Sequence, residues 1–159
     1  MNEELSRLAG RVRDNLSEVD TVLQRIKEGW QRCLSSSDDY YLDGVALNLH
    51  GLYSGLERIF ELVAEVIDGE KPAGENWHLS LLQQMSNDIP GVRPAVISEK
   101  SFDLLNEYRG FRHVVRNVYT YRFDPEKIGR LVGKAPEMFD RVRAELLAFS
   151  DFLEESAAS

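Results

Sequence analysis

The strongest constraint on the fold is an apolar stripe that runs without a break through the N-terminal part of the chain. Between residues 3 and 34 apolar side chains recur at steps of three or four. They are Leu5, Leu8, Val12, Leu16, Val19, Leu23, Ile26, Trp30 and Cys33. This is the period of an α-helix with one buried face. A stripe that keeps so strictly to this spacing favours antiparallel packing in a helical bundle.

A second long helix is expected over residues 39–68, after a turn rich in serine and aspartate. Its end is marked by Gly69, a common residue just beyond a helix. Gly44, Gly51 and Gly55 lie within it. Because glycine weakens a helix by roughly 0.8–1 kcal/mol per site, we expect these three to mark the close approach of another helix backbone.

The rest of the chain is also predicted to be helical. The expected elements are a shorter helix from Asn76 or Trp77 to about Met85, a helix over residues 98–117, a short helix from Pro125 to about Val132 and a last helix opened by Pro136. No segment alternates strongly enough to predict a strand. The predicted fold is all-α: an up-and-down antiparallel bundle of four main helices plus short ones. A chain of 159 residues is expected to form a single domain.

Composition limits the function and the compartment. The net charge of -8 disfavours non-specific binding to nucleic acid, because such binding needs clustered Lys and Arg. The single cysteine, Cys33, excludes an internal disulfide and a cysteine-based metal site. No apolar run approaches the ~18–20 residues that span a bilayer, and the N-terminus lacks the features of a signal peptide. We therefore expect a cytoplasmic protein with no membrane partner.

Residues 108–123 form a local positive segment in this acidic chain, with four arginines and no acidic residue. On a helix, Arg109, Arg112, His113 and Arg116 share one face, opposite an apolar face. These like charges repel one another, so negatively charged groups are expected nearby to compensate the repulsion. Two interpretations remain open: the arginines pair with acidic residues, such as those stepping by four from Glu57 along the second helix, or they bind phosphate or RNA.

The sequence shows no motif for binding a cofactor or a metal ion. The sequence has no phosphate-binding loop, dinucleotide fingerprint, zinc-protease motif or EF-hand loop, so no cofactor is predicted. His50, His78 and His113 fall on separate elements without metal-ligand spacing, and no metal site is expected. His50 is interpreted as a satisfied core histidine, and His78 as a surface or capping residue.

The stretch from Phe111 to Tyr119 resembles the signature of the HEPN superfamily, in particular HepT-like toxins. That signature is an arginine, four to six residues, a histidine, one residue and a tyrosine. Arg112 and Tyr119 match it, while Asn117 stands where the histidine belongs. The order of the predicted helices is similar as well.

The resemblance implies a homodimer whose two motif helices form a composite, metal-independent ribonuclease site. It also implies a partner, a minimal nucleotidyltransferase antitoxin, which in some such systems adenylylates the motif tyrosine, here Tyr119. Arg112 would bind the scissile phosphate, Tyr119 would line the site, and Arg109, Arg116 and Arg122 would hold flanking phosphates of RNA or a nucleotide.

The asparagine changes what the site can do. Its amide does not titrate near neutral pH, and the loss of general acid or base help typically costs ~10²–10⁴ in rate. His113 is one candidate to replace the motif histidine. The sequence thus leaves two functions open: a HepT-like ribonuclease toxin, with Arg112, His113, Asn117 and Tyr119 as candidate catalytic residues, or a non-catalytic module that binds nucleotide, RNA or a nucleotidyltransferase.

Overall fold

The computed structural model describes residues 2–159, and its regular elements are all helices. The long ones are α1 (Glu3–Ser36), α2 (Tyr40–Val63), α4 (Glu99–Asn117) and α5 (Pro125–Ala158). The short ones are the π-helical turn η1 (Ala64–Asp68), which continues α2, the helix α3 (Trp77–Met85) and the 3₁₀ turn η2 (Thr120–Arg122). Within the described residues no β-strand forms, which confirms the all-α prediction.

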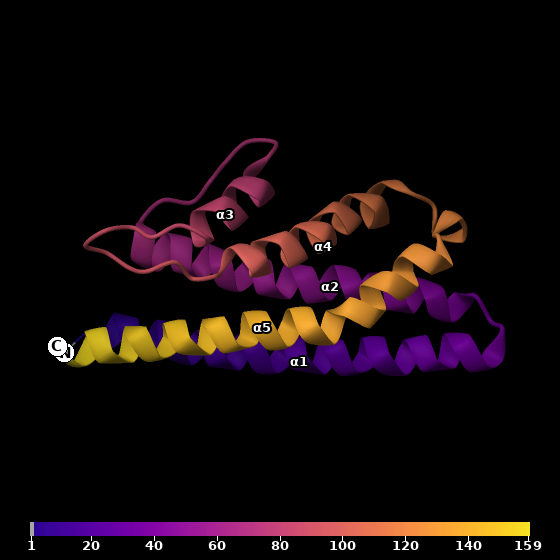
Figure 1. The fold of residues 1–159 in the computed structure, drawn as a ribbon, viewed down its shortest axis with the longest axis horizontal. Coiled ribbons are helices and arrows are strands. Elements are labelled where there is room, and N and C mark those ends of the chain that lie inside the picture. Colours follow the sequence, from indigo (N-terminus) through magenta and orange to yellow (C-terminus); the bar gives the residue numbers. More distant parts are fainter. Residues whose placement is uncertain (1) are drawn as a thin grey trace.

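The four long helices run up and down, as predicted. Figure 1 shows α1 and α2 joined by a tight turn, α5 returning along α1, and α4 lying on the other side of α2 with α3 above it. The two ends of the described chain lie together, and the Asn2 amide donates a hydrogen bond to the Ala157 carbonyl at 2.8 Å. None of the helices in residues 2–159 combines the length and apolar character needed to cross a bilayer.

The predicted stripe is the buried face of α1. Its members from Leu8 to Ile26 are almost fully buried. The Asn2 side chain caps the helix by accepting hydrogen bonds from the amides of Glu4 and Leu5, as expected at an N-terminus. The stripe packs against α2 on one side and α5 on the other, so α1 is the helix around which the bundle closes.

One boundary prediction was wrong. The two helices expected at residues 125–132 and from Pro136 onward form one continuous helix, α5, with Pro136 inside it. A proline in a helix interior removes a hydrogen bond and costs ~3 kcal/mol or more. Here Ala135, Met138 and Phe139 beside it are fully buried, and this packing keeps the helix intact. The helix bends in its first half (Figure 1), as proline-containing helices do.

Of the three glycines predicted to mark a close helix approach, only Gly55 has a near neighbour on another helix. A Cβ atom at Gly55 would lie 2.8 Å from Val19 Cγ2 of α1, whereas one at Gly44 would meet nothing within 4 Å. At Gly51 the nearest atom, Val22 Cγ1, would be 3.9 Å away. The neighbour at Gly55 is a side chain, so the expected approach of a helix backbone was wrong.

A buried ion pair fixes the segment between α2 and α4. The Arg93 side chain is 0% exposed and that of Asp68 3%. Arg93 donates to the two carboxylate oxygens of Asp68 at 2.6 and 2.8 Å and to the carbonyls of Gln84, Asn87 and Pro94. Asp68 also accepts a hydrogen bond from the Gln84 side chain of α3. The pair therefore ties α3 and the loop after it to the end of η1.

We predict that Arg93→Ala lowers the free energy of unfolding by about 3–5 kcal/mol, because it leaves the Asp68 carboxylate buried without its partner. The matched control is Arg141→Ala, which removes an exposed pair with Glu137 at 3.9 Å and should cost less than about 1 kcal/mol. Urea unfolding of both variants measures the difference. Equal, small losses would contradict the role assigned to Arg93.

Candidate functional site

The two arginines at the centre of the positive segment lie in a cleft of about 520 Å³ lined by α1, α2, α3 and α4. We call it the α2–α4 cleft. Its histidine and charged lining residues are Glu18 of α1, His50, Glu57, Arg58 and Glu61 of α2, His78 of α3, and Arg112 and Arg116 of α4. It therefore gathers residues that are up to 101 positions apart in the sequence, from Asn15 to Arg116.

Helical spacing and a few anchors position these side chains. On α2, His50, Ser54 and Glu57 are three or four residues apart and share one face. Arg112 and Arg116 likewise occupy successive turns of α4. The rotation of α4 is set by the buried Tyr108, whose hydroxyl donates to the Leu131 carbonyl of α5 at 2.7 Å. With that side of α4 held against the core, the arginine side turns toward α2.

The arginines of the positive segment are not held by ion pairs. Among the described residues, no carboxylate lies within 4 Å of Arg109, Arg112, Arg116 or Arg122. The acidic residues of α2 have other partners: Glu57 contacts His78. Glu61 and η1's Glu65 both contact Lys71. The interpretation that the arginines form direct pairs with these glutamates was wrong, and their charge is available to an anion.

His50 was expected to be a satisfied core histidine, and this was wrong. Its Nε2 atom is buried and has no hydrogen-bond partner among the described residues. Burial, and then the positive charges of Arg112 and Arg116, lower the pKa of His50. A buried polar atom without a partner costs free energy comparable to a lost hydrogen bond.

His78 was expected at the surface or in a cap, and this was also wrong. Its Nδ1 lies 2.7 Å from Glu57 Oε2, and the two side chains are only 15% and 7% exposed. The ring also stacks on Trp77, with centroids 3.7 Å apart. An Nδ1–H that donates to the carboxylate fixes the ring and leaves Nε2 as the nitrogen that can exchange a proton with a ligand.

The other helical residues of the predicted site lie outside this cleft. His113 and Asn117 are exposed. The Asn117 amide donates to the His113 carbonyl at 2.8 Å and lies 3.2 Å from His113 Nδ1. The Arg109 guanidinium donates to the Asn106 side chain at 2.8 Å. The structure thus brings together Arg112 and Arg116 but separates them from the position of the motif histidine.

The tyrosines after α4 form an exposed aromatic pair. Tyr119 and Tyr121 are 73% and 75% exposed, and their rings stack with centroids 5.9 Å apart. The Arg122 guanidinium lies over the Tyr121 ring, 5.5 Å from its centroid. Tyr119, the predicted modification site, is thus open to a modifying enzyme but does not line the α2–α4 cleft.

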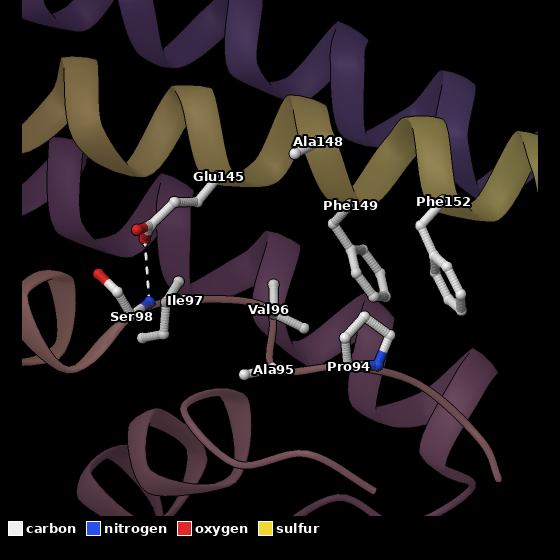
Figure 2. A pocket seen from close by; sticks show the side chains of 9 residues that line it. All are labelled: Pro94, Ala95, Val96, Ile97, Ser98, Glu145, Ala148, Phe149 and Phe152. Atoms are coloured by element: carbon white, nitrogen blue, oxygen red, sulfur yellow. Dashed lines mark hydrogen bonds between the residues drawn. The ribbon is translucent and has the colours of Figure 1, made fainter. Parts of the chain in front are cut away.

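A second groove, of about 340 Å³, lies between α5 and the segment from Pro94 to Ser98. Figure 2 shows its apolar lining, with Phe149 and Phe152 beside Pro94, and the Ser98 amide donating to Glu145 at 3.1 Å. It holds no arginine or histidine and does not suit an anion. Within residues 2–159 no group of three or more His, Cys, Asp or Glu side chains is arranged to hold a metal ion.

Fold and site together define a helical bundle with an open cleft between α2 and α4, whose lining includes three arginines and three glutamates. A family model described as "HepT-like protein" matches residues 44–153, which contain the whole of α3 and α4 and most of α2 and α5. The chain belongs to this HepT-like family, and the resemblance inferred from its motif is confirmed. The comparisons with curated proteins and with solved structures give no match.

The lowered pKa of His50 predicts a pH dependence of stability. As pH falls below the ordinary value of 6.5, the unfolded chain binds a proton at His50 that the folded protein does not yet bind. Stability is therefore lost in the window from 6.5 down to the folded pKa. Urea unfolding across this window should give a steeper decline for wild type than for His50→Gln. Identical slopes would contradict the assigned environment.

Proposed function

We propose that this protein is the ribonuclease toxin of a HepT-like toxin–antitoxin pair and that it cleaves RNA without a metal ion at the α2–α4 cleft. The observation that carries the proposal is the pair Arg112 and Arg116, which face the cleft with no carboxylate within 4 Å among the described residues. Membership of the HepT-like family supports it independently.

The chemistry requires charge stabilisation more than any other help. When a ribose 2′-hydroxyl attacks the adjacent phosphorus, negative charge grows on the non-bridging phosphate oxygens. An arginine presents a planar set of N–H donors that matches these oxygens and remains charged. Donors already in place for the developing charge typically contribute ~10²–10³ in rate each. Arg112 is the proposed donor to the scissile phosphate, and Arg116 the donor to its neighbour.

The oligomeric state and the partner are also proposed from the resemblance to HepT-like toxins. We infer a homodimer that brings the two α4 helices together, and an antitoxin that is a minimal nucleotidyltransferase. The exposed aromatic side chains Tyr119 and Tyr121, which follow α4, support a protein contact near the end of that helix. Arg109 and Arg122 remain candidates for flanking phosphates, and Tyr119 remains the candidate for adenylylation.

A second candidate function is binding without cleavage. Asn117, which stands in place of the motif histidine, has its amide hydrogen-bonded within its own helix. An amide in that position neither titrates nor reaches the cleft. A module that keeps the arginines and lacks the proton-transfer group would bind RNA or a nucleotide phosphate and release it unchanged.

The test is RNA cleavage in excess EDTA by wild type, Arg112→Ala and Arg143→Ala. Arg143 is an exposed arginine of α5 outside the cleft and serves as the matched control. We expect wild type and Arg143→Ala to cleave alike and Arg112→Ala to lose about 10²–10³ in rate.

Two outcomes would contradict the proposal that this protein is a ribonuclease. Equal cleavage by all three proteins would point to a contaminating nuclease. RNA binding that depends on Arg112 without any cleavage would establish the binding module in its place.

A further inference from the structure

We propose that the indole ring of Trp77 is a base-stacking subsite of the α2–α4 cleft, which holds one unpaired base of an RNA whose phosphate binds Arg112 and Arg116. The inference rests on the proposed function and deepens it, since it names the residue that would select unpaired RNA. Trp77 takes no part in proton transfer, and the exposed His113 and Asn117 of α4 remain accessible to the second chain of the proposed homodimer.

Trp77 shares the cleft with the arginines. It is the first residue of α3 and lies in the same lining as Arg112 and Arg116. The cleft volume of about 520 Å³ falls within the range of ~300–1,000 Å³ that is typical of small-ligand sites. Such sites combine apolar or aromatic walls with a few polar groups that fix the orientation of the ligand. Apart from two histidines, Trp77 is the aromatic residue of this lining.

Contacts with two helices fix the indole ring before any ligand binds. The His78 ring stacks on it with centroids 3.7 Å apart and planes tilted by 32°. His78 is held in turn by Glu57 of α2, with Nδ1 2.7 Å from Oε2. Trp77 packs against the hydrophobic core but is only partly buried, so part of its surface is open in the cleft. An aromatic surface that is already ordered loses little conformational freedom when a base stacks on it.

The charges of the lining favour a phosphate in the same cleft. Its three arginines, Arg58, Arg112 and Arg116, have no carboxylate within 4 Å among the described residues. Two of its three glutamates contact other partners, and the third, Glu18 of α1, is exposed. A nucleotide whose phosphate binds the α4 arginines would therefore carry its base into the cleft that Trp77 lines.

Stacking on Trp77 would distinguish unpaired from paired RNA. Every base has a π face, and stacking on an aromatic side chain typically strengthens binding by ~5- to 150-fold per base. A base in a duplex is already stacked between its neighbours, whereas the bases of single strands, loops and bulges can turn outward onto a protein ring. Phosphate contacts alone do not make this distinction. The expected ligand is thus a single-stranded segment, with little preference among the four bases.

Trp77 can report its own occupancy by fluorescence. The chain contains one other tryptophan, Trp30 of α1, which does not line the cleft. Trp30→Phe therefore leaves Trp77 as the remaining indole, and Trp77→Phe is the matched control. Each variant is titrated with a short single-stranded 2′-O-methyl RNA, which cannot be cleaved, and with the same ribose–phosphate chain lacking its bases. We expect the RNA to quench Trp30→Phe but not Trp77→Phe, and the abasic chain to quench neither.

Affinities measure what the ring contributes. Wild type should bind the RNA ~5- to 150-fold more tightly than the abasic chain, and more tightly than a duplex of the same sequence. Trp77→Leu keeps an apolar side chain but has no aromatic face, so it should lose most of this advantage and bind the abasic chain as wild type does. Arg112→Ala should weaken binding of both ligands. If Trp77→Leu fails to fold, the quenching and the abasic comparison carry the test.

The outcomes separate this inference from the proposed function. Equal affinity of wild type for RNA and abasic chain, or no quenching in Trp30→Phe, would overturn the subsite. Binding that still depended on Arg112 would then leave the proposed function standing. RNA affinity unchanged in a folded Trp77→Leu variant, or an equal loss of both ligands in it, would also overturn the subsite. Binding unaffected by Arg112→Ala, or no binding by wild type, would overturn both proposals.

Discussion

The buried ion pair between Arg93 and Asp68 is the contact on which the shape of the α2–α4 cleft depends. The segment from η1 to α4 contains the short helix α3, whose Leu81, Leu82 and Met85 are fully buried. Arg93 and Asp68 tie its two ends together, and the Gln84 side chain joins α3 to the same carboxylate. Together with the burial of α3, this clamp holds His78 against Glu57 and so maintains one wall of the cleft.

The second constraint is electrostatic. A chain with net charge -8 has enough carboxylates to neutralise every arginine of the positive segment, yet Glu57, Glu61 and Glu65 contact His78 and Lys71 instead. Within residues 2–159, Arg112 and Arg116 of α4 therefore have no carboxylate within 4 Å, and the buried Nε2 of His50 has no hydrogen-bond partner. Unsatisfied groups gathered in one cleft lower stability, and such groups are characteristic of functional sites.

The sequence predicted the features that depend on local spacing. The stripe from Leu5 to Cys33 predicted α1, and the matching residues Arg112 and Tyr119 predicted the family. It could not predict the contact between His78 and Glu57, because the two residues lie on different helices, 21 positions apart in the sequence. The unsatisfied Nε2 of His50 depends on how α4 packs over α2, and the continuity of α5 through Pro136 depends on burial that local propensity does not reveal.

The central claim is that RNA binds in the α2–α4 cleft, and the three histidines allow a direct test. Imidazole NMR signals would be followed while a 2′-O-methyl RNA is added to wild type and to Arg112→Ala. The account predicts large shifts for His50 and His78, small ones for the exposed His113, and none in the variant. Shifts confined to His113 would place the RNA on the outer side of α4 and contradict it.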